Sequence, residues 1–92
     1  MINIKNGTES DRLRLLSKYP NLDKFFFGNG RLVIAKNGNE IVGFLWAHKR
    51  KISAPVEAEE MFINYITVFE PELRCRGIGT QMIQRIIEIA RA

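Results

Sequence analysis

This sequence of 92 residues has a single cysteine, no long apolar run and no pattern of interleaved aromatic and basic residues. One cysteine, Cys75, excludes an internal disulfide and a cysteine-based zinc site, so we expect no metal and a reducing, cytoplasmic setting. Apolar runs of only a few residues exclude a membrane-spanning helix, which needs about 18 or more. The first ten residues lack a basic start followed by an apolar stretch, so we expect no secretory signal.

Positive charge is in moderate excess and spread along the chain. Fourteen Lys and Arg against ten Asp and Glu give a formal net charge of +4, with local clusters at 49–51 and at Arg74 and Arg76. This distribution suits an anionic small ligand or a weak nucleic-acid contact. Because no aromatic residues alternate with the basic ones, specific recognition of single-stranded nucleic acid is not favoured.

Apolar periodicity and turn residues predict one domain over residues 1–92, without repeats or linkers. The expected elements are a strand (1–5), a helix to about Lys18 capped by Thr8 and Asp11, a short helix (22–26), strands at 31–36, 40–48 and 61–69, and a helix (79–92). The fold class is therefore α/β (α+β), with an antiparallel sheet and the order β-α-α-β-β-β-α. The pair Asn37-Gly38 favours a tight hairpin between the second and third strands.

The same apolar pattern predicts which side chains are buried. In the first helix, Leu13, Leu16 and Tyr19 form the expected buried stripe, and Phe25 and Phe26 of the short helix pack inward. Residues 49–58 form a polar connection. The strand at 61–69 is apolar on both faces, which predicts a central strand covered on each side. The buried face of the last helix is expected to contain Met82, Ile83, Ile86, Ile87 and Ala90.

The segment between the last strand and the last helix is the one that suggests chemistry. Helix N-termini present unpaired N–H groups, and Gly77 and Gly79 would let phosphate oxygens approach them closely. Arg74 and Arg76 add positive charge. This arrangement suits a pyrophosphate. The alternative is an ordinary strand-to-helix loop with solvated arginines.

In its context, the motif Arg74-Cys75-Arg76-Gly77-Ile78-Gly79 resembles the acetyl-CoA signature of the GNAT superfamily of N-acetyltransferases. The resemblance covers essentially the whole chain and corresponds to the amino-terminal half of that fold. It implies acetyl-CoA as cosubstrate, an amine acceptor, and direct acetyl transfer. The implied cofactor-binding residues are Ile66, Thr67 and Val68, whose backbone would hold the pantetheine arm, and Arg74, Cys75, Arg76, Gly77, Ile78, Gly79 and Thr80, whose amides and arginines would hold the pyrophosphate.

The sequence departs from the family pattern in several places. One additional residue separates Val68 from Pro71, which predicts a bulge or a longer loop. Cys75 replaces a frequent glycine and is interpreted as a tolerated loop residue. The usual fourth-strand glutamate is missing, and Glu59 and Glu60 are the substitute candidates for the general base, unless they are solvated carboxylates. Tyr65 is interpreted as a core residue and His48 as a surface residue.

The chain also stops before the usual fifth strand, the following helix and the closing strands of the family. We therefore expect a truncated or minimal member in which the fourth strand is an exposed edge. A second copy of the chain, forming a homodimer, or another partner is expected to cover that edge.

Three functions remain open from the sequence. The first is an acetyl-CoA-dependent N-acetyltransferase, and the second is a non-catalytic CoA-binding or interaction module. The third is a small basic nucleic-acid-associated protein, which only the net charge supports.

Overall fold

The computed structural model describes residues 2–26, 30–52, 58–73 and 76–91, with the backbone alone at 25, 49–52 and 58–60. The element order agrees with the predicted one, with an additional 3-10 turn before the last helix. In chain order the elements are β1 (Ile2–Asn6), α1 (Glu9–Lys18), the 3-10 helix η1 (Pro20–Phe25), β2 (Gly30–Asn37), β3 (Glu40–Ile52), β4 (Ala58–Val68), the 3-10 turn η2 (Pro71–Leu73) and α2 (Ile78–Arg91).

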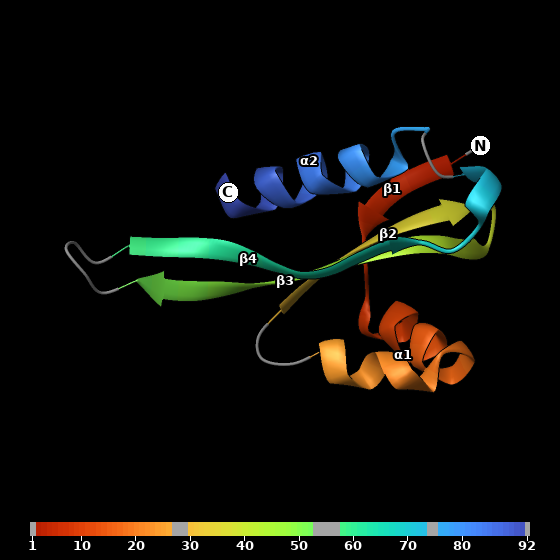
Figure 1. The fold of residues 1–92 in the computed structure, drawn as a ribbon, viewed down its shortest axis with the longest axis horizontal. Coiled ribbons are helices and arrows are strands. Elements are labelled where there is room, and N and C mark those ends of the chain that lie inside the picture. Colours follow the sequence, from red (N-terminus) through yellow and green to blue (C-terminus); the bar gives the residue numbers. More distant parts are fainter. Residues whose placement is uncertain (1, 27–29, 53–57, 74–75, 92) are drawn as a thin grey trace.

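The four strands form one antiparallel sheet in the order β1-β2-β3-β4. Helix α2 lies on one face of this sheet, and α1 with η1 lies on the other (Figure 1). The predicted hairpin joins β2 and β3, and Gly38 adopts φ +63 in its turn, a conformation that favours glycine. The fold is therefore a three-layer arrangement of helix, sheet and helix.

Helix α1 begins with the predicted capping box. The Asp11 backbone N–H donates to Thr8 Oγ1 at 3.2 Å, and the Thr8 backbone N–H donates to Asp11 Oδ2 at 2.9 Å. The expected buried stripe is wrong at Leu13, which is 55% exposed, while Leu15 is buried. The stripe runs through positions 11, 15 and 19, because residues four apart share one helix face.

Helix α2 packs an aliphatic stripe on the sheet, and this stripe is narrower than predicted. Its buried residues are Ile78, Met82 and Ile86, in contact with residues of β2 and β3 such as Val33 and Leu45. Three other residues of the expected buried face, Ile83, Ile87 and Ala90, are exposed. The sheet covers the i, i+4, i+8 row, so Ile83 and Ile87, one position away, face outward, while Ala90 continues the covered row beyond its last buried residue, near the end of the helix.

The opposite face combines aromatic rings with leucine and isoleucine side chains. Phe44 is fully buried, and its ring centroid lies 5.4 Å from that of Phe26, 5.4 Å from that of Tyr65 and 5.9 Å from that of Phe69. Phe26 therefore packs inward as predicted, whereas the Phe25 side chain lies outside the described part of the chain. Trp46 meets Phe26 edge-on at 5.1 Å. These contacts hold α1 and η1 to the sheet.

The prediction of a polar connection over residues 49–58 is wrong at both ends. Strand β3 continues to Ile52 and β4 begins at Ala58, with Arg50 opposite Glu60 and Lys51 opposite Glu59. Backbone hydrogen bonds build such a ladder and do not require apolar side chains. Residues 53–57 lie outside the described part.

Strand β4 is the outer strand of the described sheet, so the prediction of a strand covered on each side is wrong. Its side chains Phe62, Ile63 and Ile66 are 42%, 38% and 36% exposed. That β4 forms an edge agrees with the alternative expectation of an exposed fourth strand. The homodimer that would cover this edge stays a prediction.

Within the described ranges, no helix has the length and apolar character required to span a bilayer. Among the same residues, no cluster of three or more His, Cys, Asp or Glu side chains is arranged to hold a metal ion.

Candidate functional site

The end of β4 lies at the outer edge of the described sheet. The Phe69 N–H donates to the Val42 carbonyl at 2.8 Å, and Val68, Thr67 and Ile66 lie opposite Gly43, Phe44 and Leu45. Hydrogen-bonded and non-hydrogen-bonded pairs alternate along an antiparallel ladder, so Thr67 faces β3 with its N–H and C=O. The N–H and C=O of Ile66 consequently point away from β3, toward the edge. This is the geometry that an extended ligand needs to run along the strand.

The beginning of α2 lies beside this edge. Gly77 adopts φ +77, and its carbonyl accepts the Gln81 N–H at 2.9 Å, so the helix ladder starts from this residue. The N–H groups of the first turn have no acceptor within the helix and carry its positive dipole end. Buried Ile78 anchors this turn in the aliphatic core, which holds its amides in a defined place next to β4.

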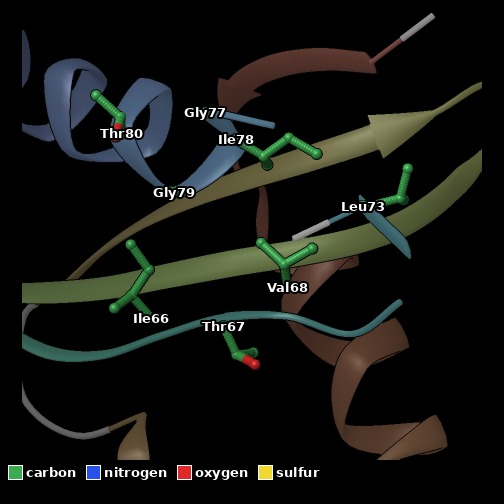
Figure 2. Close-up of a pocket in the computed structure, with 8 residues that line it drawn as sticks. All are labelled: Ile66, Thr67, Val68, Leu73, Gly77, Ile78, Gly79 and Thr80. Carbon is green, nitrogen blue, oxygen red and sulfur yellow. The ribbon is translucent and has the colours of Figure 1, made fainter. Parts of the chain in front are cut away.

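A cleft of about 440 Å³ separates the two elements. Figure 2 shows Ile66 and Val68 on the side of α2, with Thr67 pointing to the opposite side of β4. A Cβ atom placed on Gly79 would lie 3.9 Å from Ile66 Cδ1, so a larger side chain at this position would extend into the cleft. The cleft is lined by Ile66, Thr67, Val68, Leu73, Gly77, Ile78, Gly79 and Thr80.

Most of the residues predicted from the sequence to bind the cofactor thus line one cleft. Arg76 is exposed and lies next to the cleft in the chain without being part of its lining. Arg74 and Cys75 lie outside the described residues. The sequence analysis missed Leu73, which packs against the aliphatic core from η2. Its signal was an apolar residue between two charged ones in the connection to the helix.

The connection from β4 to α2 explains the additional residue between Val68 and Pro71. The chain bends at Phe69 and then forms the 3-10 turn η2. Stacking of Phe69 on Tyr19 at a centroid distance of 4.5 Å secures the bend to the α1 face. The only change of register between β3 and β4 within the described residues lies earlier in β4, before Tyr65. Trp46 is opposite Tyr65 and Ala47 is opposite Ile63, so Asn64 is the extra residue of a β-bulge.

The candidates for the general base lie apart from the residues that the sequence predicts to bind the cofactor. Glu59 and Glu60 are six or more positions before Ile66, which corresponds to about 20 Å along a strand. Tyr65 is half-buried with its ring against Phe44, in agreement with its interpretation as a core residue.

His48 differs from the expected surface histidine. It is half-buried on β3 and its ring Nδ1 lies 2.6 Å from Asn64 Oδ1. No periodic pattern in the sequence reveals this pair, because it depends on the bulge between two strands.

Comparisons with known proteins concern the family and the fold of the chain. The family model described as "Acetyltransferase (GNAT) family" matches residues 3–92. A search of curated protein sequences gave no match.

Solved structures with a similar fold include an acetyltransferase from Vibrio fischeri, with 17% identity, a TM-score of 0.74, and coverage of 97% of this chain and 86% of that one. A transcriptional regulator from Bacillus halodurans C-125 has 23% identity and a TM-score of 0.71, with 99% of this chain and 75% of that one covered. An integron cassette protein from the mobile metagenome of V. cholerae has 19% identity and a TM-score of 0.70, with 97% and 67% covered. At these identities the likeness concerns the fold. Because the family model matches nearly the whole sequence, the chain belongs to the acetyltransferase (GNAT) family.

Proposed function

We propose that this protein binds acetyl-CoA in the cleft between β4 and α2 and transfers the acetyl group to an amine. Family membership supports acyl transfer in general, and members of the family generally use acetyl-CoA. The observation that carries the proposal is the cleft itself, where the outer edge of the described sheet meets a helix N-terminus with Gly77 just before it and Gly79 in its first turn.

The helix end suits the pyrophosphate of CoA. The amides of Ile78, Gly79 and Thr80 are the first-turn donors, and the first turn of α2 contains no acidic residue that would repel an anion. Among the described residues, no atom lies within 4 Å of the position that a Cβ atom would take on Gly77, so these residues leave the approach to the amides open. Arg76, and Arg74 by resemblance to the family motif, would add positive charge beside the phosphates.

The strand edge suits the pantetheine arm. This arm carries amide groups, and the outward N–H and C=O of Ile66 can pair with them as a neighbouring strand would. The apolar side chains of Ile66, Val68 and Leu73 provide contacts for its methylene groups.

The chemistry that follows is attack of a neutral amine on the thioester carbonyl. A backbone N–H at the edge of β4 would donate to the carbonyl oxygen, which gains negative charge during the attack. Because the backbone donor is already fixed in place, it does not have to reorient when the charge develops. A separate group near the amine must accept the proton that the amine nitrogen loses.

Calorimetric titration with acetyl-CoA tests the proposal. We expect saturable binding by the wild-type protein and at least about 100-fold weaker binding by Gly77→Asp, because a carboxylate would enter the anion site. The matched control is Gly38→Asp. Gly38 also has a positive φ and an open Cβ position, but it lies in the β2–β3 turn. Similar affinity in Gly77→Asp and the wild type would contradict the proposed site.

A specific observation supports the second candidate, a CoA-binding module without turnover. Residues 61–68 of β4 contain no Asp or Glu, and the two carboxylates of this strand, Glu59 and Glu60, lie six or more positions before Ile66 in the cleft wall. Thiol release from acetyl-CoA over a panel of amines separates the two. Binding without amine-dependent thiol release would favour the module.

A further inference from the structure

We propose that His48 accepts the proton of the attacking amine and that Asn64 positions its ring, an inference that rests on the proposed acetyl transfer. His48 would be the catalytic base in place of a carboxylate on β4. Asn64 would act through His48 as a positioning residue.

The hydrogen bond between the two side chains sets the tautomer of the His48 imidazole. A base needs a ring nitrogen with a free electron pair, and this tautomer has one on Nε2. Asn64 Oδ1 can only accept, so His48 Nδ1 is the donor at 2.6 Å. In a neutral imidazole the second nitrogen, Nε2, then carries the lone pair and is the atom that can take up a proton. Ring contact with Phe62, at 5.7 Å between centroids, also restricts the orientation of the ring.

The bulge places Asn64 close to the cleft wall along β4. Asn64 is the extra residue between Ile63 and Tyr65, two positions or about 7 Å along the strand from Ile66, while His48 lies in register with Phe62, four positions or about 13 Å from Ile66. Bulges bend a strand and redirect its side chains, and many lie next to active sites. An amine that attacks a thioester held near Ile66 would thus lie between that thioester and the hydrogen-bonded pair.

The pair also lies on the side of the sheet from which an amine can approach. Ala47 and Met61 pack in the aliphatic core under α2, so the next side chains, His48 and Phe62, point to the α1 face. The cofactor cleft occupies the α2 side. An acceptor approaching from the α1 face would pass the ring of Phe62, which is 42% exposed, and would meet the carbonyl from the side opposite the helix.

Other described groups are less suitable as bases. His48 is the only histidine in the chain, and imidazole is the side chain whose ordinary pKa lies nearest neutrality. The candidates Glu59 and Glu60 are far along the strand and lie in register with Lys51 and Arg50. Tyr65 packs its ring against Phe44 in the core.

The proposed step balances as follows. The amine nitrogen forms a bond to the acetyl carbonyl carbon and gives up one proton to Nε2 of His48. The carbon–sulfur bond breaks, and sulfur leaves with the electron pair. The proton on Nε2 then passes to the thiolate, so the products are the acetylated amine, the free thiol and a neutral histidine.

The tautomer can be tested without any substrate. Because the chain has one histidine, a protein labelled uniformly with ¹⁵N gives a single set of ring-nitrogen signals. In mildly alkaline buffer we expect the proton on Nδ1 and the lone pair on Nε2. We expect Asn64→Asp to keep this tautomer, because its carboxylate also accepts, and Asn64→Ala to give a mixture. A wild-type ring with its proton on Nε2 would overturn the proposal.

Kinetics test the role directly, with thiol release from acetyl-CoA in the presence of spermidine or phenethylamine. We expect His48→Gln to lower kcat about 100-fold or more, with acetyl-CoA affinity unchanged by calorimetry. Asn64→Ala should lower kcat about five- to tenfold, the effect of one lost hydrogen bond, and Asn64→Asp should restore most of it. Wild-type kcat in folded His48→Gln would overturn the proposal.

The two proposals fail in distinguishable ways. If the wild-type protein does not bind acetyl-CoA, the proposed function is wrong. If it binds acetyl-CoA and releases thiol equally well with and without the imidazole at position 48, only the role of His48 is wrong. Circular dichroism of each variant separates these results from a failure to fold.

Discussion

The two faces of the sheet differ in what fills them. Under α2 the contacts are aliphatic, and the adjoining cleft is built from backbone and glycines. Under α1 and η1, six aromatic rings, Phe44 and Trp46 among them, pack with leucine and isoleucine side chains, and the polar pair of His48 and Asn64 lies on this face. The α2 face, with its exposed backbone groups, suits a cosubstrate that is recognised through phosphate and amide groups. The α1 face suits an acceptor that side chains must select.

Removing the central ring of the aromatic face should have the largest effect. Phe44 is fully buried among Phe26, Tyr65 and Phe69, so Phe44→Ala should lower the free energy of unfolding by about 3–5 kcal/mol. Urea unfolding followed by circular dichroism measures this. Phe44→Leu, which keeps most of the volume, should cost clearly less. A loss below about 1 kcal/mol in Phe44→Ala would mean that the ring cluster does not hold the α1 layer.

Filling the cleft should separate binding from stability on the other face. Gly79→Leu extends a side chain toward Ile66 across the cleft, and we expect acetyl-CoA affinity to fall about 30- to 100-fold, or 2–3 kcal/mol. Stability should change by less than about 1 kcal/mol, because leucine favours a helix more than glycine does. Gly79→Ala is the milder control, since its Cβ meets Ile66 at ordinary contact distance. Undiminished affinity in Gly79→Leu would place the ligand elsewhere.

The smallest expected effect concerns the start of α1 and depends on pH. Burial would raise the pKa of Asp11, but hydrogen bonds from the Thr8 backbone and side chain and from Lys36 outweigh it and hold this pKa below its usual range. A carboxyl group with a lowered folded pKa stabilises the fold above its unfolded pKa of about 3.9 and loses this contribution as the pH falls toward the folded value. The free energy of unfolding should therefore decrease in acid.

Two variants check that assignment. Thr8→Ala should cost about 1 kcal/mol at neutral pH, the usual value of an N-cap. Asp11→Asn should flatten the acid part of the stability curve relative to the wild type. An unchanged acid slope in Asp11→Asn would assign the pH dependence to other carboxyl groups.

Local signals in the sequence predicted most of the framework. The Asn37-Gly38 turn, the Thr8–Asp11 capping box and the element order are confirmed, since each depends on residues close together in the chain. It was harder to predict which face of each helix is buried. Leu13 and Ile87 are apolar but exposed, because the partner surface selects one helical row and the sequence offers two.

The same contrast between local and long-range signals applies to the cleft between β4 and α2 and to the pair of His48 and Asn64. The cleft could be predicted because a strand end, two glycines and a helix start are consecutive in sequence, and their backbone geometry is local. The pair could not, because it joins residues sixteen positions apart through a bulge that moves Asn64 out of register. Sequence alone thus determined that the backbone of a strand end and that of a helix start would lie together. Only the tertiary structure decided which side chains stand beside that site, since a one-residue shift in strand pairing changes the face on which a side chain lies.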